Sequence, residues 1–394
     1  MFPHCLEYGY SLGRGCSGLN NRYYRTYAQI DLGAIAQNFD SLRALLPAGV
    51  KVLSIVKADA YGHGAVAVAR QLESRTDFFA VSAVDEGVEL RQAGIQKPIL
   101  ILSYTDPQEY DALLEHDIRA ALYNIDEAKL LSAKAKEHGK TAVVHIAVDT
   151  GMGRIGFPVT EDAADAAAEI AALPNLCVEG VFSHYATADC ADKTEAEKQT
   201  ACFDAFLSML ERRGVSIPIR HICNSAGAME FDRRYDMVRL GIALYGLYPS
   251  DEVDKSKVRL RPAMQVFSHV IHVKTVEPGT AIGYGRAYIA PDRRRIATVS
   301  IGYADGFNRA FTGCGSVLVG GIEAPVVGKV CMDQIMVDVT GAGDVKPGDE
   351  VVILGTDGVH TLTADGIGAK IGSFGYEVIC NFMPRVHRVY VGEI

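Results

Sequence analysis

The stretch VLSIVKADAYGHG, residues 52–64, is the first of a series of apolar runs that decide the fold. Its apolar half is typical of a buried strand, and that strand ends at Lys57. A lysine at the end of a core strand is costly to desolvate unless its charge is paired or lost. A lysine with a lowered pKa is a nucleophile that forms Schiff bases. The alternative is a lysine whose ammonium group reaches out to water.

The composition is that of a globular protein with room for two domains. The chain has 394 residues, of which 48% are hydrophobic and 22% charged, and its formal net charge is −9. This charge argues against nucleic acid or an anionic membrane surface as a partner, and no apolar run is long enough to span a bilayer. The nine cysteines form no Cys-x-x-Cys pair, so we expect no metal site and a cytoplasmic location.

Short apolar runs alternate with amphipathic stretches between about residues 50 and 250. Eight runs are predicted to be strands: 52–56, 78–82, 98–103, 119–123, 142–148, 178–184, 219–224 and 237–242. The clearest predicted helices are 63–73, 84–93, 125–137, 161–172 and 195–213. Eight strands with intervening helices indicate an α/β protein with a (β/α)8 TIM barrel. A doubly wound open sheet is the alternative, but no Gly-x-Gly-x-x-Gly follows the first strand.

The pattern changes after about Pro262. Strand-like segments are predicted at 265–276, 295–303, 316–330, 334–339, 350–354 and 388–391, with one short helix at 364–372. Glycine and proline pairs separate them, which is typical of turns in a mostly-β domain. We therefore expect an N-terminal extension at residues 1–26, a barrel at 27–262 and a C-terminal β domain at 263–394.

Polar residues lie where the predicted barrel strands end, which is where barrel enzymes place their active sites. They are Lys57, Arg154, His184, Asn224, Ser225, Arg239 and Gly241. Each has a structural alternative: a satisfied core histidine for His184, an ion pair for Arg239 and a helix cap for Ser225. Their gathering on one face of one barrel favours a shared site.

These residues suggest a pyridoxal 5'-phosphate site. Ser225, Tyr61 and the amides near Gly241 and Ile242 are candidates for holding a phosphate, which barrels commonly bind after their last two strands. A lysine nucleophile beside a phosphate cradle points to this cofactor. Arg239 would donate to the pyridine nitrogen and leave it unprotonated, because an arginine keeps its proton. His184 would bridge to Arg239.

At these residues the chain closely resembles the alanine racemases, from about Tyr27 to the C-terminus. The shared motifs are VKADAYGHG at 56–64, DTGMGRIG at 149–156, HYATAD at 184–189, residues 224–225 and 239–242, GYG at 283–285, GYADG at 302–306 and CMD at 331–333. The resemblance implies a cytoplasmic isomerase that interconverts L- and D-alanine and supplies D-alanine for peptidoglycan. It also implies the barrel, the C-terminal β domain and pyridoxal 5'-phosphate.

The resemblance also implies residue roles in a homodimer whose active sites are shared. Lys57 would carry the Schiff base and act as one catalytic base, with Tyr284 of the partner subunit as the second. Arg154 and Met332 would hold the substrate carboxylate, with Met332 also from the partner, and Tyr303 would line the approach. Two bases on opposite faces suit a racemisation, in which a proton leaves one face and returns on the other.

Two positions depart from the family pattern. Ala147 stands where many members carry a carbamylated lysine whose negative charge orients the arginine, so a bound anion such as chloride, or another side chain, would hold Arg154 instead. Pro384 stands where a tyrosine usually lines the approach to the site. The second departure leaves substrate scope open between alanine and serine, or a broader set of amino acids.

Two other classes of protein share parts of this pattern. A barrel-type pyridoxal-phosphate decarboxylase would place an acidic residue at the pyridine nitrogen, where this chain has Arg239. A non-catalytic carrier of the cofactor would need only a lone barrel, and the C-terminal domain with Tyr284 argues against it. Release of carbon dioxide would favour the first class, and colour without racemisation the second.

Overall fold

The computed structural model describes residues 24–392, so most of the expected extension at 1–26 lies outside the described residues. The chain forms two compact units. One comprises residues 32–263, and the other combines the first strand with residues 264–391. Within residues 24–392 no helix is long and apolar enough to cross a membrane. No group of three or more potential metal ligands occurs in that part of the chain.

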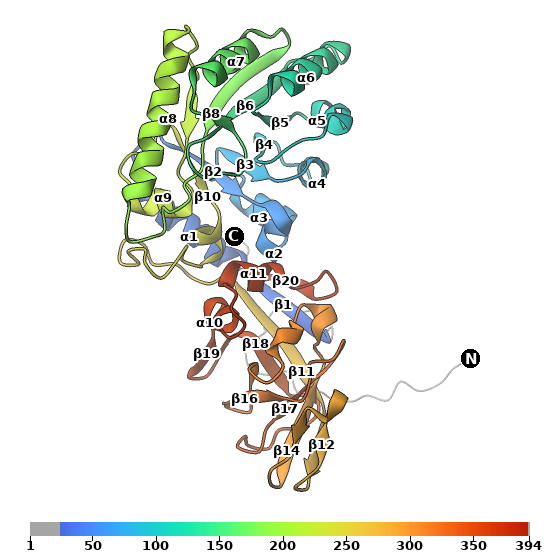
Figure 1. Cartoon of the computed structure of the whole chain (residues 1–394). Coiled ribbons are helices and arrows are strands. Elements are labelled where there is room, and N and C mark those ends of the chain that lie inside the picture. Colours follow the sequence, from blue (N-terminus) through green and yellow to red (C-terminus); the bar gives the residue numbers. More distant parts are fainter. Residues whose placement is uncertain (1–23, 393–394) are drawn as a thin grey trace, which may run out of the picture. The chain divides into compact units, whose positions relative to one another are not determined.

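The first unit is a parallel barrel, which confirms the predicted fold class (Figure 1). In the order of the sheet its strands are β10 (Met237–Leu240), β2 (Lys51–Ile55), β3 (Phe78–Val81), β4 (Ile99–Ile101), β5 (Ile118–Leu122), β6 (Ala142–Asp149), β8 (Leu176–Phe182) and β9 (Ile219–His221). All eight lie where the apolar runs predict them. The barrel is almost closed, because backbone hydrogen bonds from Asp236 N to Arg220 O and from Arg239 N to Cys223 O join its two ends.

Helices lie outside the barrel strands (Figure 1). They are α1 (Leu32–Arg43), α3 (Ala65–Leu72), α4 (Val84–Gln92), α5 (Tyr110–Glu115), α6 (Ile125–Glu137), α7 (Glu161–Ala172), α8 (Thr194–Arg212) and α9 (Ser225–Glu230). Local sequence sets their starts: Asn124 caps α6 and Thr160 caps α7, each accepting backbone N–H groups of the first turn. The inner residues of β3 and β4 are fully buried, so the barrel core is packed rather than hollow.

The second unit is built on a nine-stranded, mostly antiparallel sheet. Its order is β19 (His360–Leu362), β18 (Glu350–Asp357), β15 (Ser316–Val319), β16 (Ile322–Val327), β17 (Ile335–Asp338), β14 (Arg294–Val299), β11 (Met264–Val276), β1 (Thr26–Asp31) and β20 (His387–Val391). A separate hairpin joins β12 (Ala281–Ile282) to β13 (Tyr288–Ile289). Strand β1, of which residues 27–31 fall inside the region expected to form the barrel (27–262), pairs with β11 and β20 of the second unit.

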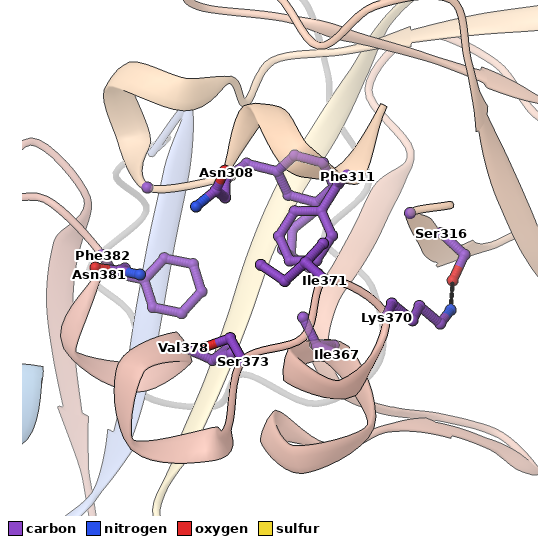
Figure 2. Close-up of a pocket in the computed structure, with 14 residues that line it drawn as sticks. Asn308, Phe311, Ser316, Ile367, Lys370, Ile371, Ser373, Val378, Asn381 and Phe382 are labelled. Atoms are coloured by element: carbon purple, nitrogen blue, oxygen red, sulfur yellow. Dashed lines mark hydrogen bonds between the residues drawn. The ribbon is translucent and has the colours of Figure 1, made fainter. Parts of the chain in front are cut away.

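The second unit also contains two short helices, α10 (Ala364–Ala369) and α11 (Gly375–Cys380). Figure 2 shows the small, mainly apolar pocket between them and Phe311, lined by Ile367, Ile371 and Phe382. Lys370 stands at its rim and donates to Ser316 at 2.5 Å. Asn308 and Asn381 line both this pocket and the wider depression described below. The apolar pocket and the depression therefore share part of their walls.

Candidate active site

Lys57 lies in a cavity at the C-terminal ends of the barrel strands. It follows β2 directly and begins the short segment α2 (Lys57–Gly62). The cavity has a volume of about 220 Å3. Its lining includes Lys57, Ser82, Ala147, Arg154, His184 and Arg239. Four of the polar residues singled out in the sequence, Lys57, Arg154, His184 and Arg239, thus share one cavity.

The segment after Lys57 has an unusual backbone. The four residues from Ala58 to Tyr61 all have φ angles of 52–54°, so they form one left-handed turn without a single glycine. Such a conformation costs L-residues energy, and strained segments concentrate at functional sites. Ala58 N donates to Glu86 Oε1 at 2.6 Å, and Asp59 Oδ1 accepts from Ala65 N at 2.8 Å. These bonds hold a turn that the sequence pattern did not reveal.

The loop after β6 presents Arg154. The Asp149 carboxylate accepts from Gly151 N at 2.9 Å and from Gly153 N at 3.0 Å. Burial would raise the pKa of Asp149, but these backbone donors outweigh it and lower the pKa below its ordinary value. Gly156 has a φ of +126°, and a Cβ there would lie 2.5 Å from Asp149 N, so only glycine fits. Ala147 is buried and lines the same cavity as Arg154.

Arg239 is buried and held by acceptors on three sides. Its Nη2 donates to Ser183 O at 2.8 Å and to Ile222 O at 2.9 Å. The same nitrogen lies 3.1 Å from His184 Nδ1, so the expected bridge between these side chains is present. Burial lowers the pKa of His184 well below its usual range, and the charges of Arg239, Arg154 and Lys57 act in the same direction. His184 is therefore neutral and accepts from Arg239 through Nδ1.

The candidate phosphate cradle is formed by three segments of the barrel unit. Gly241 N donates to Ser225 Oγ at 2.9 Å. A Cβ on Gly241 would lie 3.0 Å from Tyr61 Oη, so the glycine lets that hydroxyl group come close to the backbone. Asn224 caps α9 by accepting from Gly227 N at 2.9 Å, which fixes Ser225 at the first turn. Ile242 begins the 3-10 turn after Gly241.

The remaining candidates gather in a depression of the second unit. Tyr284, Tyr303 and Met332 all line an open hollow of about 1080 Å3. Their exposed fractions are 72%, 41% and 53%, which is high for such large side chains. Tyr303 N donates to Cys331 O and Ala304 N to Met332 O, each at 3.0 Å, so these two loops lie side by side. Pro384 directly follows Met383, another residue of the lining.

A buried carboxylate that the sequence pattern did not reveal fixes these loops. Asp305 accepts from Gly302 N at 2.8 Å and from Arg385 Nε at 2.6 Å, and it also pairs with Arg25. Arg385 in turn donates to Asp333 at 2.7 Å, beside Met332. Asp305 therefore connects the loop of Tyr303 to the loop of Met332. The signal in the sequence was an acidic residue inside a glycine-rich turn, which on its own predicts only a loop.

The structure thus brings the candidates together in two groups. The barrel unit holds Lys57, Tyr61, Arg154, His184, Asn224, Ser225, Arg239, Gly241 and Ile242. The second unit holds Tyr284, Tyr303 and Met332. Each group is compact within its own unit.

Comparison with known proteins gives matches over both units. The family model described as alanine racemase, N-terminal domain, matches residues 30–249, and the alanine racemase, C-terminal domain, matches residues 263–390. The alanine racemase of Clostridium novyi is 44% identical over 373 residues, covering 93% of this chain and 96% of that protein. The alanine racemase of Desulforamulus reducens is 44% identical over 368 residues and is covered to 99%.

Solved structures agree. The alanine racemase of Clostridium difficile 630 matches with a TM-score of 0.90 and 42% identity, covering 93% of this chain and 96% of that one. The alanine racemase from Bacillus anthracis, solved with bound L-Ala-P, matches with a TM-score of 0.89 and 34% identity, over 94% and 96% of the two chains. With both domains matched and relatives aligned over nearly their whole length, this chain belongs to the alanine racemase family of isomerases.

Proposed function

We propose that this protein is a pyridoxal-phosphate-dependent racemase that interconverts L- and D-alanine. The observation that carries the proposal is the convergence of Lys57, Arg154 and Arg239 on one barrel cavity, in a chain of the alanine racemase family. The three side chains supply a nucleophilic amine, a carboxylate-binding cation and a donor for a ring nitrogen. A supply of D-alanine for peptidoglycan would be the cellular use of the reaction.

The residues present fit the cofactor. Tyr61 Oη lies where a Cβ on Gly241 would be only 3.0 Å away, and Ser225 Oγ accepts from Gly241 N, so two hydroxyl groups gather at this glycine and suit a group rich in acceptor oxygens such as a phosphate. Arg239 is fully buried in the cavity wall and has only donors to offer, which suits an unprotonated ring nitrogen. When bound, pyridoxal phosphate supplies an electron sink that acidifies the α-hydrogen of an amino acid.

The protein's own residues bind the substrate and transfer the α-proton. Arg154 binds the substrate carboxylate from its loop after β6, together with Met332 of the partner subunit. Lys57 Nζ takes up or returns the α-proton on one face of the substrate, and Tyr284 Oη of the partner subunit does so on the other. Because each base needs to act only on its own face, neither has to move around the substrate during turnover.

The position of Tyr284 supports a shared site in a homodimer. Tyr284 and Met332 are 72% and 53% exposed within their own unit, on the wall of an open depression. Large exposed side chains of this kind commonly mark a surface that another molecule covers. We propose that they complete the barrel cavity of a second copy of the chain, which would give the C-terminal unit a direct part in the chemistry.

The test is to incubate the protein with L-alanine and pyridoxal phosphate and to measure D-alanine. Wild-type protein should form D-alanine, and Lys57→Ala should form none and should lack the visible absorbance of the bound cofactor. Lys51→Ala is the matched control, because Lys51 is exposed at the other end of the same strand. Turnover by Lys57→Ala at the wild-type rate, without added amine, would refute the assignment of Lys57.

A second candidate activity is the racemisation of serine or of a broader set of amino acids. Pro384 follows Met383 in the lining of the depression and removes the hydroxyl group that a tyrosine would present there. The loss of a polar group near the approach favours a wider tolerance of side chains. The ratio of kcat/KM for L-alanine to that for L-serine decides between the two activities.

A further inference from the structure

A chain of polar side chains crosses the interior of the barrel beneath Arg239. Arg239 Nη1 lies 3.0 Å from His221 Nδ1, and His221 Nε2 lies 2.9 Å from His145 Nδ1. His145 Nε2 lies 3.1 Å from Glu179 Oε2, which also accepts from Arg119 Nε at 2.9 Å. The five side chains come from β10, β9, β6, β8 and β5, so they connect the cavity wall to the opposite flank of the barrel.

The two ends of this series of side chains, Arg239 and Glu179, determine where each histidine carries its proton. An arginine can only donate, so His221 must accept through Nδ1 and carry its own proton on Nε2. His221 then donates to His145 Nδ1, which leaves the proton of His145 on Nε2, facing Glu179. An ionised carboxylate can only accept, so this arrangement satisfies each contact from the guanidinium group to the carboxylate. With either histidine in the other tautomer, two donors or two acceptors would face each other.

The surroundings keep both histidines neutral. His145 and His221 are fully buried, and burial lowers the pKa of each below its ordinary value. The positive charge of Arg239 lowers the pKa of both further, and at His145 these effects outweigh the hydrogen bond and charge of Glu179, which raise it. The side chain of Phe182 stacks on His221 with ring centroids 5.2 Å apart, and Phe78 meets His145 edge-on at 6.3 Å. Two neutral rings thus connect a buried cation to a carboxylate.

The backbone of β8 leaves room for these hydrogen-bonded side chains. The register between β6 and β8 shifts at Glu179, so that Val144 pairs with Val178 while His145 pairs with Gly180. Such a bulge re-aims the side chain of the extra residue. A Cβ on Gly180 would lie 2.2 Å from His145 Nδ1, so the imidazole occupies the space that any other residue would fill. A packed barrel core is ordinarily apolar, and a buried polar chain is costly unless it is fully satisfied.

Arg239 needs a counter-charge that its direct partners do not supply. Among residues 24–392, its hydrogen-bond partners are the backbone oxygens of Ser183, His221 and Ile222 and the imidazoles of His184 and His221. None of these is a carboxylate, and an uncompensated buried cation is strongly disfavoured. Glu179 is the carboxylate that the two imidazoles connect to it.

We infer that Glu179 and His145 are positioning residues for the reaction, which hold Arg239 and its charge at the cofactor ring through His221. This inference rests on the proposed function, because it assigns Arg239 to the pyridine nitrogen. Neither Glu179 nor His145 is among the residues that line the cavity, so their effect must pass along the hydrogen bonds. Loss of Glu179 leaves the Nε2 proton of His145 without its acceptor and weakens each contact up to Arg239.

The first experiment reads the protons directly in the full-length protein, with and without pyridoxal phosphate. Selective 15N labelling of histidine and long-range 1H–15N correlation at pH 7 should show His145 and His221 neutral, each with its proton on Nε2. A proton on Nδ1 of either ring, or a doubly protonated ring, would overturn the inference. This readout does not depend on turnover, so it stands or falls separately from the racemase assignment.

The second experiment removes the acceptor while keeping the length of the side chain. Glu179→Met should lower kcat by about tenfold to a hundredfold, the range expected for leaving a buried polar group unsatisfied, and should raise the Kd for pyridoxal phosphate. KM for alanine should change less than twofold, since Arg154 binds the carboxylate. Glu169→Gln, which alters an exposed pair with Lys129 on the outside of the barrel, is the control.

Glu179→Gln keeps an acceptor oxygen without the charge, so its kcat should lie between those of the wild type and Glu179→Met. If Glu179→Met folds and retains wild-type kcat and cofactor affinity, the inference is wrong. If the wild type lacks racemase activity but both histidines carry their protons on Nε2, the polar chain stands and the proposed function fails.

Discussion

In the left-handed turn after Lys57, glycine should raise the free energy of unfolding at one position and not at another two residues away. Ala58 and Ala60 both have a φ of 53°, but Ala58 is exposed whereas Ala60 is fully buried. Holding an L-residue in this conformation costs about 1–2 kcal/mol, and glycine avoids that cost. The greater conformational freedom of glycine in the unfolded chain lowers the free energy of unfolding by about 0.5–1 kcal/mol.

The two substitutions therefore share the same backbone terms and differ in packing. Ala58→Gly loses an exposed methyl group and should stabilise the protein by about 0.5–1 kcal/mol. Ala60→Gly also loses a buried methyl group, worth about 0.8 kcal/mol or more, and should be neutral or destabilising. The difference between the two variants, about 1 kcal/mol in favour of Ala58→Gly, is the sharper quantity because the backbone terms cancel.

The assay is equilibrium unfolding in urea, followed by circular dichroism on cofactor-free protein. Equal free energies of unfolding for the two variants would refute the burial argument. A loss of more than about 0.5 kcal/mol in Ala58→Gly would show that this turn is not strained. Ala133→Gly, at an exposed position in the middle of α6, should be destabilised and serves as a reference for glycine in unstrained helical backbone.

The other predictions concern the site. Tyr284→Phe should keep the cofactor but lower solvent-deuterium incorporation by more than a hundredfold from at least one alanine enantiomer, and exchange at the wild-type rate from both enantiomers would exclude Tyr284 as a base. If an anion takes the place left by Ala147, raising chloride should lower KM for alanine or raise kcat, and indifference of both constants to halide would exclude that anion. Burial would raise the pKa of Glu179, but hydrogen bonds from His145 and Arg119 lower it to about 2. The wild type should therefore have a higher free energy of unfolding than Glu179→Gln, and this difference should be present in full above the ordinary pKa near 4.5. It should be lost as pH falls towards about 2, as measured by urea unfolding at a series of pH values.

Much of the barrel was predictable, because it depends on local patterns. All eight barrel strands and the helices at 125–137 and 161–172 lie where the periodicity places them. Strand β1 was less accessible to this reasoning, since its pairing with β11 joins residues more than two hundred positions apart. The left-handed turn was hidden for another reason: Ala58 to Tyr61 include no glycine, and alanine normally signals a right-handed helix.

The candidate site also has a part that could be predicted from the sequence and a part that could not. The ends of the strands brought Lys57, Arg154, His184 and Arg239 to one face, and the contact of His184 with Arg239 follows from the barrel geometry. The residues behind them were not predictable. His145 and His221 look like ordinary polar residues within apolar runs, and Glu179, which contacts His145, lies at a bulge that shifts the register of β8. Contacts that depend on a register shift leave no periodic signal in the sequence.

Chemistry on alanine tests the central proposal most directly. The protein, loaded with pyridoxal phosphate, is incubated separately with pure L-alanine and pure D-alanine, and both enantiomers are measured over time by chiral chromatography. A racemase must drive both samples to the same mixture with equal amounts of the two enantiomers, and Lys57→Ala must leave both unchanged. Loss of alanine with release of carbon dioxide, or bound cofactor with no second enantiomer in either sample, would contradict the proposal.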